Sequence, residues 1–206
     1  MEDTTTRAVD HPVDILTAEH RVIQTVLDAM EAQVLALRRG EELRKDWWSR
    51  AVEFVEMFAD KCHHGKEEAL LFPALVAHGV ADRGGPVGVM KHEHAHGREL
   101  KDAMLRASNK SDVTSLAKHA TTFIEFLRQH IDKEDHCLFQ MARAHLPQDQ
   151  VRELLLQFEQ FEVDHVGHGT HCFYLGLARD LCLEAGFLFD ADAQPTHGSS
   201  GSPPRA

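Results

Sequence analysis

Two segments of the sequence carry the same pair of residues that could bind a metal ion. His63 stands four residues before Glu67, and His130 stands four residues before Glu134, and Leu-Phe follows each pair. On an α-helix four residues turn by about 400°, so the two side chains of a pair lie about 40° apart on one face. An imidazole and a carboxylate on one face can hold one metal ion or one edge of a metal pair. The two pairs are therefore predicted to form two walls of one site.

Two further histidines, His20 and His94, lie on apolar stripes of other helical segments. A lone histidine there can simply be buried and hydrogen-bonded to a neighbour, and a histidine–glutamate pair can be an ion pair on a solvated surface. The apolar residues around both pairs argue against a solvated surface, because a buried carboxylate is costly unless it is paired or bound to metal. The predicted metal ligands are His20, His63, Glu67, His94, His130 and Glu134.

Neighbours of these residues in the chain are predicted to lie off the site. His64 and Glu68 each follow a predicted ligand by one residue, which turns them about 100° away on an α-helix. They have the same four-residue spacing, so they are the alternative pair if the register of this helix is shifted by one. His92 and His96 are placed on the surface or around the site rather than in it.

Long amphipathic helices must carry these side chains. Apolar residues recur at alternating steps of four and three, as in the helices of a bundle. Asp14 is the expected first N-cap, Pro86 suits the first turn of a helix, and Pro73 predicts a kink. No strand pattern competes, so we expect an all-α fold: an up-and-down antiparallel four-helix bundle with an appended C-terminal fifth helix. The expected helices cover residues 14–40, 42–78, 86–108, 112–145 and 147–184.

The fifth helix is the element whose contribution the sequence leaves open. His165 and His168 are candidate additional ligands, and the alternative is that they lie in the core or around the site. Glu162 is placed to hydrogen-bond a ligating imidazole. Two glycines flank His168 and favour a break in the helix. Tyr174 reaches the site only if that break occurs.

Composition limits the class of protein. The net charge of −11 argues against a nucleic-acid partner, and no apolar run approaches the ~18 residues of a membrane span. The first residues show no signal peptide, and the four cysteines form no Cys-x-x-Cys pair, so we expect free thiols in a reducing cytoplasm. We expect residues 1–12 to be flexible, residues 13–186 to form the bundle, and residues 187–206, rich in Pro, Ser and Gly, to be a disordered tail.

The mixture of imidazole and carboxylate ligands indicates which metals fit. Iron, manganese and zinc accept both, whereas calcium and magnesium prefer oxygen alone. Four-helix bundles build such sites from side chains that face inward on neighbouring helices. Two carboxylates allow bridging, which favours two metal ions, and six protein ligands on two ions leave open positions for a small molecule. A structural zinc site would need only four ligands and no open position.

The order of these residues resembles the hemerythrin-like, or HHE cation-binding, domain over roughly residues 12–145. The pattern is His, His-x-x-x-Glu, His, His-x-x-x-Glu, and it is supported by local matches at Glu19-His20, residues 63–68, residues 85–90, Glu93-His94 and residues 130–139. The resemblance implies a bundle around a non-haem centre of two iron ions joined by an oxo or hydroxo bridge.

The sequence departs from the oxygen-carrying hemerythrins in its predicted ligand set. Those proteins have a further histidine where this chain has Arg98, and an aspartate where this chain has Asp135, yet Glu134 fits the helix face better. The predicted iron environment is therefore less rich in histidine, which disfavours simple reversible oxygen carriage.

Two classes of function follow from the resemblance. The first is a di-iron protein that binds or reacts with a small oxidant, namely oxygen, peroxide or nitric oxide. As an enzyme it would be a peroxide-decomposing or nitric-oxide-reducing oxidoreductase, and an electron donor would be a further partner. The alternative is a binding protein that senses iron or oxygen, or donates iron to damaged centres. Sensors usually carry a partner domain, and related repair proteins often have a cysteine in an N-terminal segment, whereas residues 1–61 have none. We therefore favour the first class.

Overall fold

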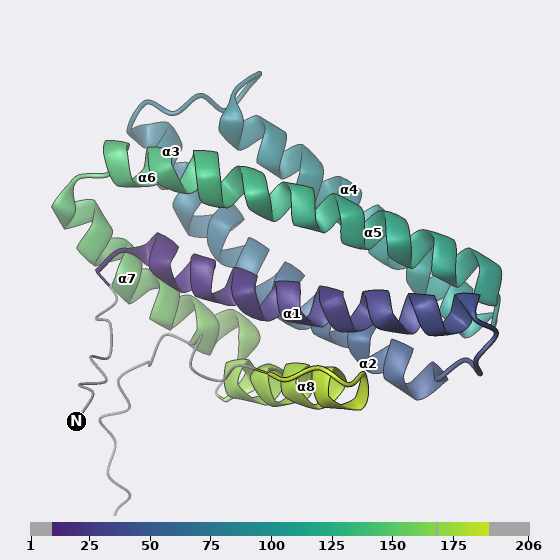
Figure 1. Cartoon of the computed structure of the whole chain (residues 1–206). Coiled ribbons are helices and arrows are strands. Elements are labelled where there is room, and N and C mark those ends of the chain that lie inside the picture. Colours follow the sequence, from purple (N-terminus) through teal and green to yellow (C-terminus); the bar gives the residue numbers. More distant parts are fainter. Residues whose placement is uncertain (1–9, 168, 190–206) are drawn as a thin grey trace, which may run out of the picture.

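The computed structural model describes residues 10–167 and 169–189, and in this part of the chain every regular element is helical (Figure 1). The α-helices are α1 (Pro12–Arg38), α2 (Lys45–Phe54), α3 (Phe72–Ala77), α4 (Pro86–Asn109), α5 (Val113–Lys133), α6 (Phe139–His145), α7 (Gln148–Phe161) and α8 (Thr170–Glu184). The π-helical segments are η1 (Val55–His64), η2 (Glu67–Leu71), η3 (Glu134–Leu138) and η4 (Glu162–Val166).

Four rods form the antiparallel bundle that the sequence predicts. The first rod is α1, the second runs from α2 through η1 and η2 to α3, the third is α4, and the fourth runs from α5 through η3 to α6. Helix α5 packs between α1 and α4, and α4 also packs against α2 (Figure 1). Pro73 lies in the first turn of α3, directly after η2, so the irregularity expected near it is a π-helical segment. No described helix has the length and apolar character needed to cross a membrane.

The fifth helix is present but broken. Gly167 and Gly169 have φ angles of 100° and 76°, which glycine adopts far more readily than residues with a side chain. The predicted single helix is therefore two helices: α7, extended by η4, and α8. Helix α7 packs against α1 and η2, and α8 packs against α1 and α2, so the pair covers one side of the bundle (Figure 1).

The ends of the described region correct two expected boundaries. Helix α1 begins at Pro12 with His11 as its N-cap, and the expected cap, Asp14, instead accepts a hydrogen bond from the His11 backbone N–H. Phe187 and Phe189 pack against the core, so the ordered chain extends past residue 186. Residues 1–9 and 190–206, where flexible ends were expected, lie outside the described residues.

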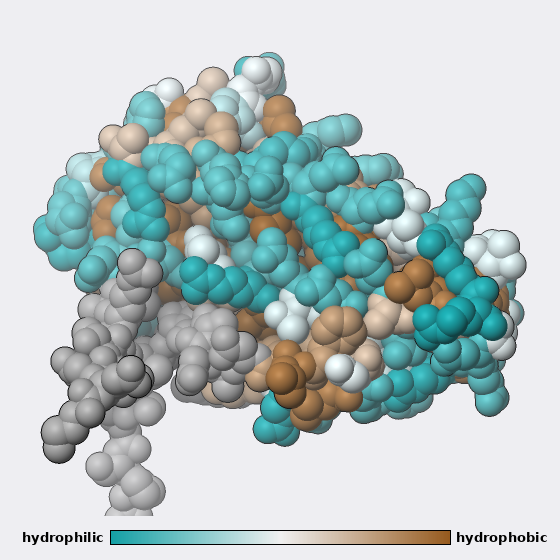
Figure 2. Space-filling view, in the orientation of Figure 1, coloured by the Kyte–Doolittle hydropathy of each residue, from teal (hydrophilic) through white to brown (hydrophobic). Residues whose placement is uncertain are grey.

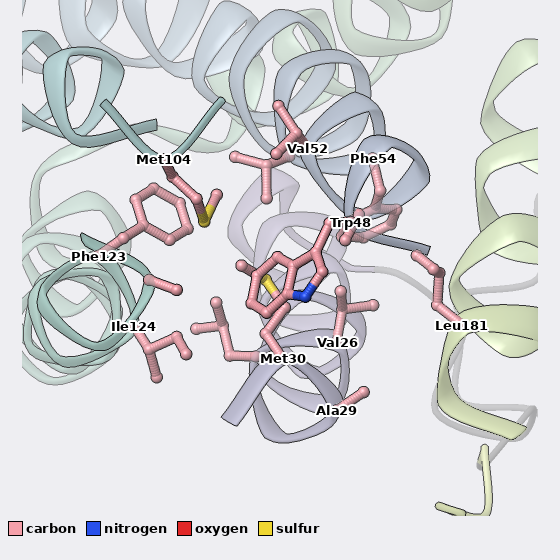
Figure 3. Close-up of a cluster of buried hydrophobic side chains, with 14 of the residues drawn as sticks. Val26, Ala29, Met30, Trp48, Val52, Phe54, Met104, Phe123, Ile124 and Leu181 are labelled. Atoms are coloured by element: carbon pink, nitrogen blue, oxygen red, sulfur yellow. The ribbon is translucent and has the colours of Figure 1, made fainter. Parts of the chain in front are cut away.

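Two apolar clusters enclose the centre of the bundle. The larger includes Trp47, Trp48 and Phe123, and Figure 3 shows the Trp48 ring lying among side chains from several helices. The smaller cluster includes Phe72 and Phe139. Along each of the four rods the predicted ligands fall between residues of one cluster and residues of the other. The face of the molecule shown in Figure 2 is mainly hydrophilic, with an exposed apolar patch over α8. The predicted site thus lies in the interior, away from bulk water.

Candidate metal centre

The six predicted ligands are buried and converge at the centre of the bundle. They form two groups together with one additional histidine, and within each group the candidate ligand atoms lie within 4.8 Å of one another. We call the first the two-histidine group: His20, His63, Glu67 and Glu134. We call the second the three-histidine group: His64, His94 and His130.

Each of the two glutamates faces both groups. The Oε1 atom of Glu67 lies 3.8 Å from Nε2 of His63, and its Oε2 atom lies 3.4 Å from Nε2 of His94. The Oε2 atom of Glu134 lies 3.2 Å from Nε2 of His20, and its Oε1 atom lies 3.6 Å from Nε2 of His94. Each of these carboxylates therefore has its oxygens close to histidines of both groups.

The atoms that point into the centre have no hydrogen-bond partner among the described residues. They are the Nε2 atoms of His20, His63, His94 and His130 and both carboxylate oxygens of Glu67 and Glu134. Buried polar atoms are nearly always hydrogen-bonded, because leaving them unpaired costs about 1–3 kcal/mol each. A concentration of unpaired nitrogen and oxygen atoms at one point fits metal ions that accept both donors, such as iron.

Carboxylates behind the histidines set their orientation. Four imidazoles each donate a hydrogen bond from Nδ1 to an aspartate or glutamate, which fixes the tautomer and leaves Nε2 free to bind metal. The pairs are His20–Asp135 (2.8 Å), His63–Glu19 (2.9 Å), His94–Glu68 (2.7 Å) and His130–Glu93 (2.9 Å). The sequence analysis did not assign these roles.

A signal for these outer carboxylates is present in the sequence. Each is adjacent in the chain to a predicted ligand but holds a histidine of another rod: Glu19 precedes His20 and bonds His63, and Glu93 precedes His94 and bonds His130. A residue next to a ligand is turned about 100° from it, toward the neighbouring helix. The acidic neighbours of the ligands therefore predict outer carboxylates, but not which histidine each one holds.

The expectation that His64 points away from the site is wrong. His64 is buried, and its ring stacks on that of His94 with the centroids 3.8 Å apart and the planes 16° apart. Its ring also lies edge-on to His130, with 5.5 Å between the centroids. His63 and His64 end the π-helical segment η1, whose i→i+5 hydrogen bonds widen the turn, so consecutive side chains are separated by less than the 100° of an α-helix. Both rings consequently face inward, and the centre has five histidines where four were expected.

Comparison with known proteins agrees with this geometry. Residues 11–142 match the family model described as the hemerythrin HHE cation binding domain. This chain belongs to that family. The family and the all-α bundle that the sequence predicted are thereby confirmed, and the ligand assignment of individual residues stays a prediction.

The relatives of this hemerythrin-family chain are distant. The iron-sulfur cluster repair protein YtfE of Dickeya chrysanthemi is 34% identical over 90 residues, which are 39% of this chain and 40% of the relative. The uncharacterized proteins Mb2018 of Mycobacterium bovis and Rv1995 of Mycobacterium tuberculosis are each 22% identical over 160 residues, 75% of this chain and 62% of theirs. The chain thus spans less than two thirds of the length of these relatives. No solved structure matches.

The structure gives Arg98, the residue that departs from the oxygen-carrying hemerythrins, a role of its own. Arg98 is outside both groups and donates hydrogen bonds to Asp60 Oδ1 (2.7 Å) and Glu68 Oε1 (2.8 Å), so it anchors the carboxylate that holds His94. The expectation of a centre poorer in histidine is therefore not met, because His64 supplies a fifth imidazole from the second rod.

None of the described residues of the fifth helix belongs to the two-histidine group or the three-histidine group. His165 is exposed and stacks on Phe161, which removes it from the candidate ligands, and His168 lies outside the described residues. The helix is broken, as Tyr174 would require, but the Tyr174 hydroxyl donates to Glu53 rather than reaching either group. Glu162 was expected to accept a hydrogen bond from a ligating imidazole. It accepts one from Lys66 instead.

The contribution of the fifth helix is instead a buried ion cluster. Lys66 is fully buried, and its ammonium donates to Glu19 and, at 2.6 Å, to Glu162 from η4. His171 from α8 lies with its Nε2 atom 3.5 Å from Glu19 Oε1. Burial alone would lower the pKa of Lys66, but the neighbouring acidic groups, chiefly Glu19 and also Glu162, together outweigh it, and the pKa lies above its usual value. Because Glu19 holds His63, this cluster connects the fifth helix to the two-histidine group.

The central carboxylates and imidazoles have strongly shifted pKa values in the metal-free protein. Burial and the facing Glu134 charge raise the pKa of Glu67 well above its usual value. Burial acts to lower the pKa of His20, but Asp135 and Glu134 raise it to about 9. Burial and the neighbouring His20 lower the pKa of His63 to about 4. At neutral pH the His20 imidazole is therefore protonated in the metal-free protein, and the Glu67 carboxyl takes up a proton more readily than an ordinary carboxyl.

Metal binding should release these protons. A metal ion needs a neutral imidazole and an ionised carboxylate, so protons held at His20 and Glu67 compete with it. Since the metal-free centre binds more protons than the loaded one, affinity should rise with pH, by about tenfold per pH unit for each proton released, below a pH of about 9. Calorimetric titration in two buffers of different ionisation enthalpy counts the protons. An affinity that is flat between about pH 6 and pH 8 would contradict the predicted protonation.

Proposed function

We propose that this protein binds two iron ions at the centre of its bundle and uses them to bind or reduce a small oxidant. The observation that carries the proposal is the set of unpaired Nε2 and carboxylate oxygen atoms that converge there. Membership of a cation-binding family supports metal binding, and the mixture of nitrogen and oxygen donors favours iron.

Two ions fit this centre better than one. The donors form two groups, and Glu67 and Glu134 lie between the groups with their oxygens directed to both. The three-histidine group would offer three imidazoles to its ion, and the two-histidine group would offer two. Counting the shared glutamates, the ion of the two-histidine group has fewer protein donors and more open positions for a small molecule.

The side chains of the protein would prepare this centre for oxidant chemistry. Bound iron would supply electron exchange and open coordination positions to oxygen, peroxide or nitric oxide. The outer carboxylates orient the imidazoles, and the two apolar clusters on either side exclude bulk water. An electron donor would be required for repeated reduction.

Iron donation is the second candidate function. The relative from D. chrysanthemi is named an iron-sulfur cluster repair protein. The two proposals differ in what leaves the protein: a reduced oxidant in the first, iron ions in the second. Mixing iron-loaded protein with peroxide or nitric oxide, and separately with an iron-depleted iron–sulfur protein, distinguishes them by measuring oxidant consumption and retained iron.

The first test is the metal content. We expect about two irons per chain after expression with iron available, because the donors of the seven residues exceed what one ion needs. Elemental analysis, with ultraviolet–visible spectra of the isolated and reduced protein, measures this. One zinc and no iron per chain would refute the proposal.

A further inference from the structure

The fifth histidine is held less firmly than the other four. The Nδ1 atom of His64 lies 3.6 Å from Asp60 Oδ1, too far for a hydrogen bond, and has no partner among the described residues. That Asp60 oxygen already accepts from Arg98 Nε at 2.7 Å. The other four imidazoles are fixed by carboxylates at 2.7–2.9 Å. His64 is thus the one histidine of the centre that lacks an orienting hydrogen bond at Nδ1.

A small cavity adjoins His64 on the side away from the two-histidine group. Its volume is about 20 Å³, and His64 and His130 line it together with Gly97, Phe126 and Leu127. That volume is sufficient for one water-sized molecule. Apolar groups supply most of the surface that faces the cavity, and Asp60, Glu93, Arg98 and Lys101 border it with charges of both signs, so it suits a small guest without net charge.

We propose that His64 is a displaceable ligand of the three-histidine group and that this cavity is the subsite from which a diatomic or peroxide molecule replaces it. The inference rests on the proposed function and adds a second position for the small molecule. His64 would help to hold the ion together with His94 and His130, and exchange of its imidazole nitrogen for a neutral guest would replace one lone-pair donor by another. No electron or proton is transferred, so the charge of the centre is unchanged.

Gly97 sets the size of the guest. A Cβ atom at this position would lie 3.5 Å from the Phe126 ring, an ordinary contact, so the chain can accommodate alanine here. Any larger side chain would occupy the cavity. A glycine at this point of α4 therefore keeps open a space that a bulkier residue would close.

The first experiment compares two histidines of the same group. His64→Ala should keep nearly two irons per chain with less than about a tenfold loss of affinity, whereas His94→Ala, which removes a firmly held imidazole, should lose iron by about 10–100-fold. Nitric oxide should bind the iron(II) form of His64→Ala faster than wild type, followed by absorbance, and added imidazole should reverse the gain. Loss of iron as severe as in His94→Ala, or nitric oxide binding at the wild-type rate, would overturn the proposal.

The second experiment tests the cavity without metal. Dissolved oxygen should enter this cavity in the iron-free wild type, detected by paramagnetic relaxation of the NMR signals of the lining residues, and Gly97→Leu should abolish that relaxation. In iron-loaded protein the same variant should slow nitric oxide binding by about tenfold or more with unchanged iron content. Gly176→Leu is the control, because no atom lies within 4 Å of a Cβ built there. If Gly97→Leu does not fold, Gly97→Ala should show a weaker effect in the same direction.

The outcomes separate this inference from the proposed function. Unchanged nitric oxide binding in folded Gly97→Leu, or no relaxation by dissolved oxygen in the wild type, would overturn the cavity as a subsite while leaving a two-iron centre in place. A wild-type protein that binds no iron would instead refute the proposed function.

Discussion

Iron-free protein should unfold far more easily than iron-loaded protein. Loading should raise the free energy of unfolding by about 4 kcal/mol when free iron is about a thousandfold above its dissociation constant, because the ligands converge only in the folded state. Without metal, the folded protein also bears the cost of the unpaired inward atoms and of two facing carboxylates. Denaturant unfolding of loaded and chelator-treated protein measures the difference, and coincident curves would contradict it.

Substitution of Glu67 should have opposite effects on iron-loaded and iron-free protein. Glu67→Gln should empty the centre, because an amide is a poor ligand and cannot bridge as an anion. In iron-free protein, however, the same change should be neutral or stabilising, since burial and the Glu134 charge disfavour an ionised Glu67 carboxyl and raise its pKa. Glu99→Gln on the exposed face of α4 is the control and should change neither property. A Glu67→Gln variant with full iron content would show that Glu67 is not a ligand.

A large loss of stability is also expected when Lys66 is replaced. Lys66→Met should lower the free energy of unfolding by about 3–5 kcal/mol, because it leaves the carboxylates of Glu19 and Glu162 in the interior without their cation. The loss should appear in iron-free protein, so that it reports on the fold and not on metal occupancy. Glu162→Gln in the Lys66→Met background should recover part of it, since one of the two uncompensated charges is removed.

Lys133 provides the matched control. It pairs with Glu93, the carboxylate that holds His130, just as Lys66 pairs with the carboxylate that holds His63. Its side chain is 44% exposed, so water screens the pair and Lys133→Met should cost no more than about 1 kcal/mol. Denaturant unfolding of both variants gives the comparison. Equal losses would mean that burial of Lys66 does not set the strength of its ion cluster.

The sequence by itself determined the helices and the inward face of most predicted ligands. The four-residue spacing of His63 and Glu67, and of His130 and Glu134, is local, and the apolar stripe shows which way each face points. These two signals lie within single helices, so they can be interpreted without knowing how the helices pack. The structure accordingly brings all six predicted ligands to one centre.

Tertiary structure decided the features that depend on helix register and on contacts between rods. His64 enters the centre because η1 is π-helical, whereas the 100° per residue of an α-helix would direct its side chain away from the centre. The burial of Lys66 depends on Glu162, 96 residues later in the chain, and the partner of each outer carboxylate lies on another rod. Periodicity within one helix carries no information about such distant partners. The convergence of the six predicted ligands could therefore be predicted from local signals, but the groups that orient them are defined only when the rods pack together.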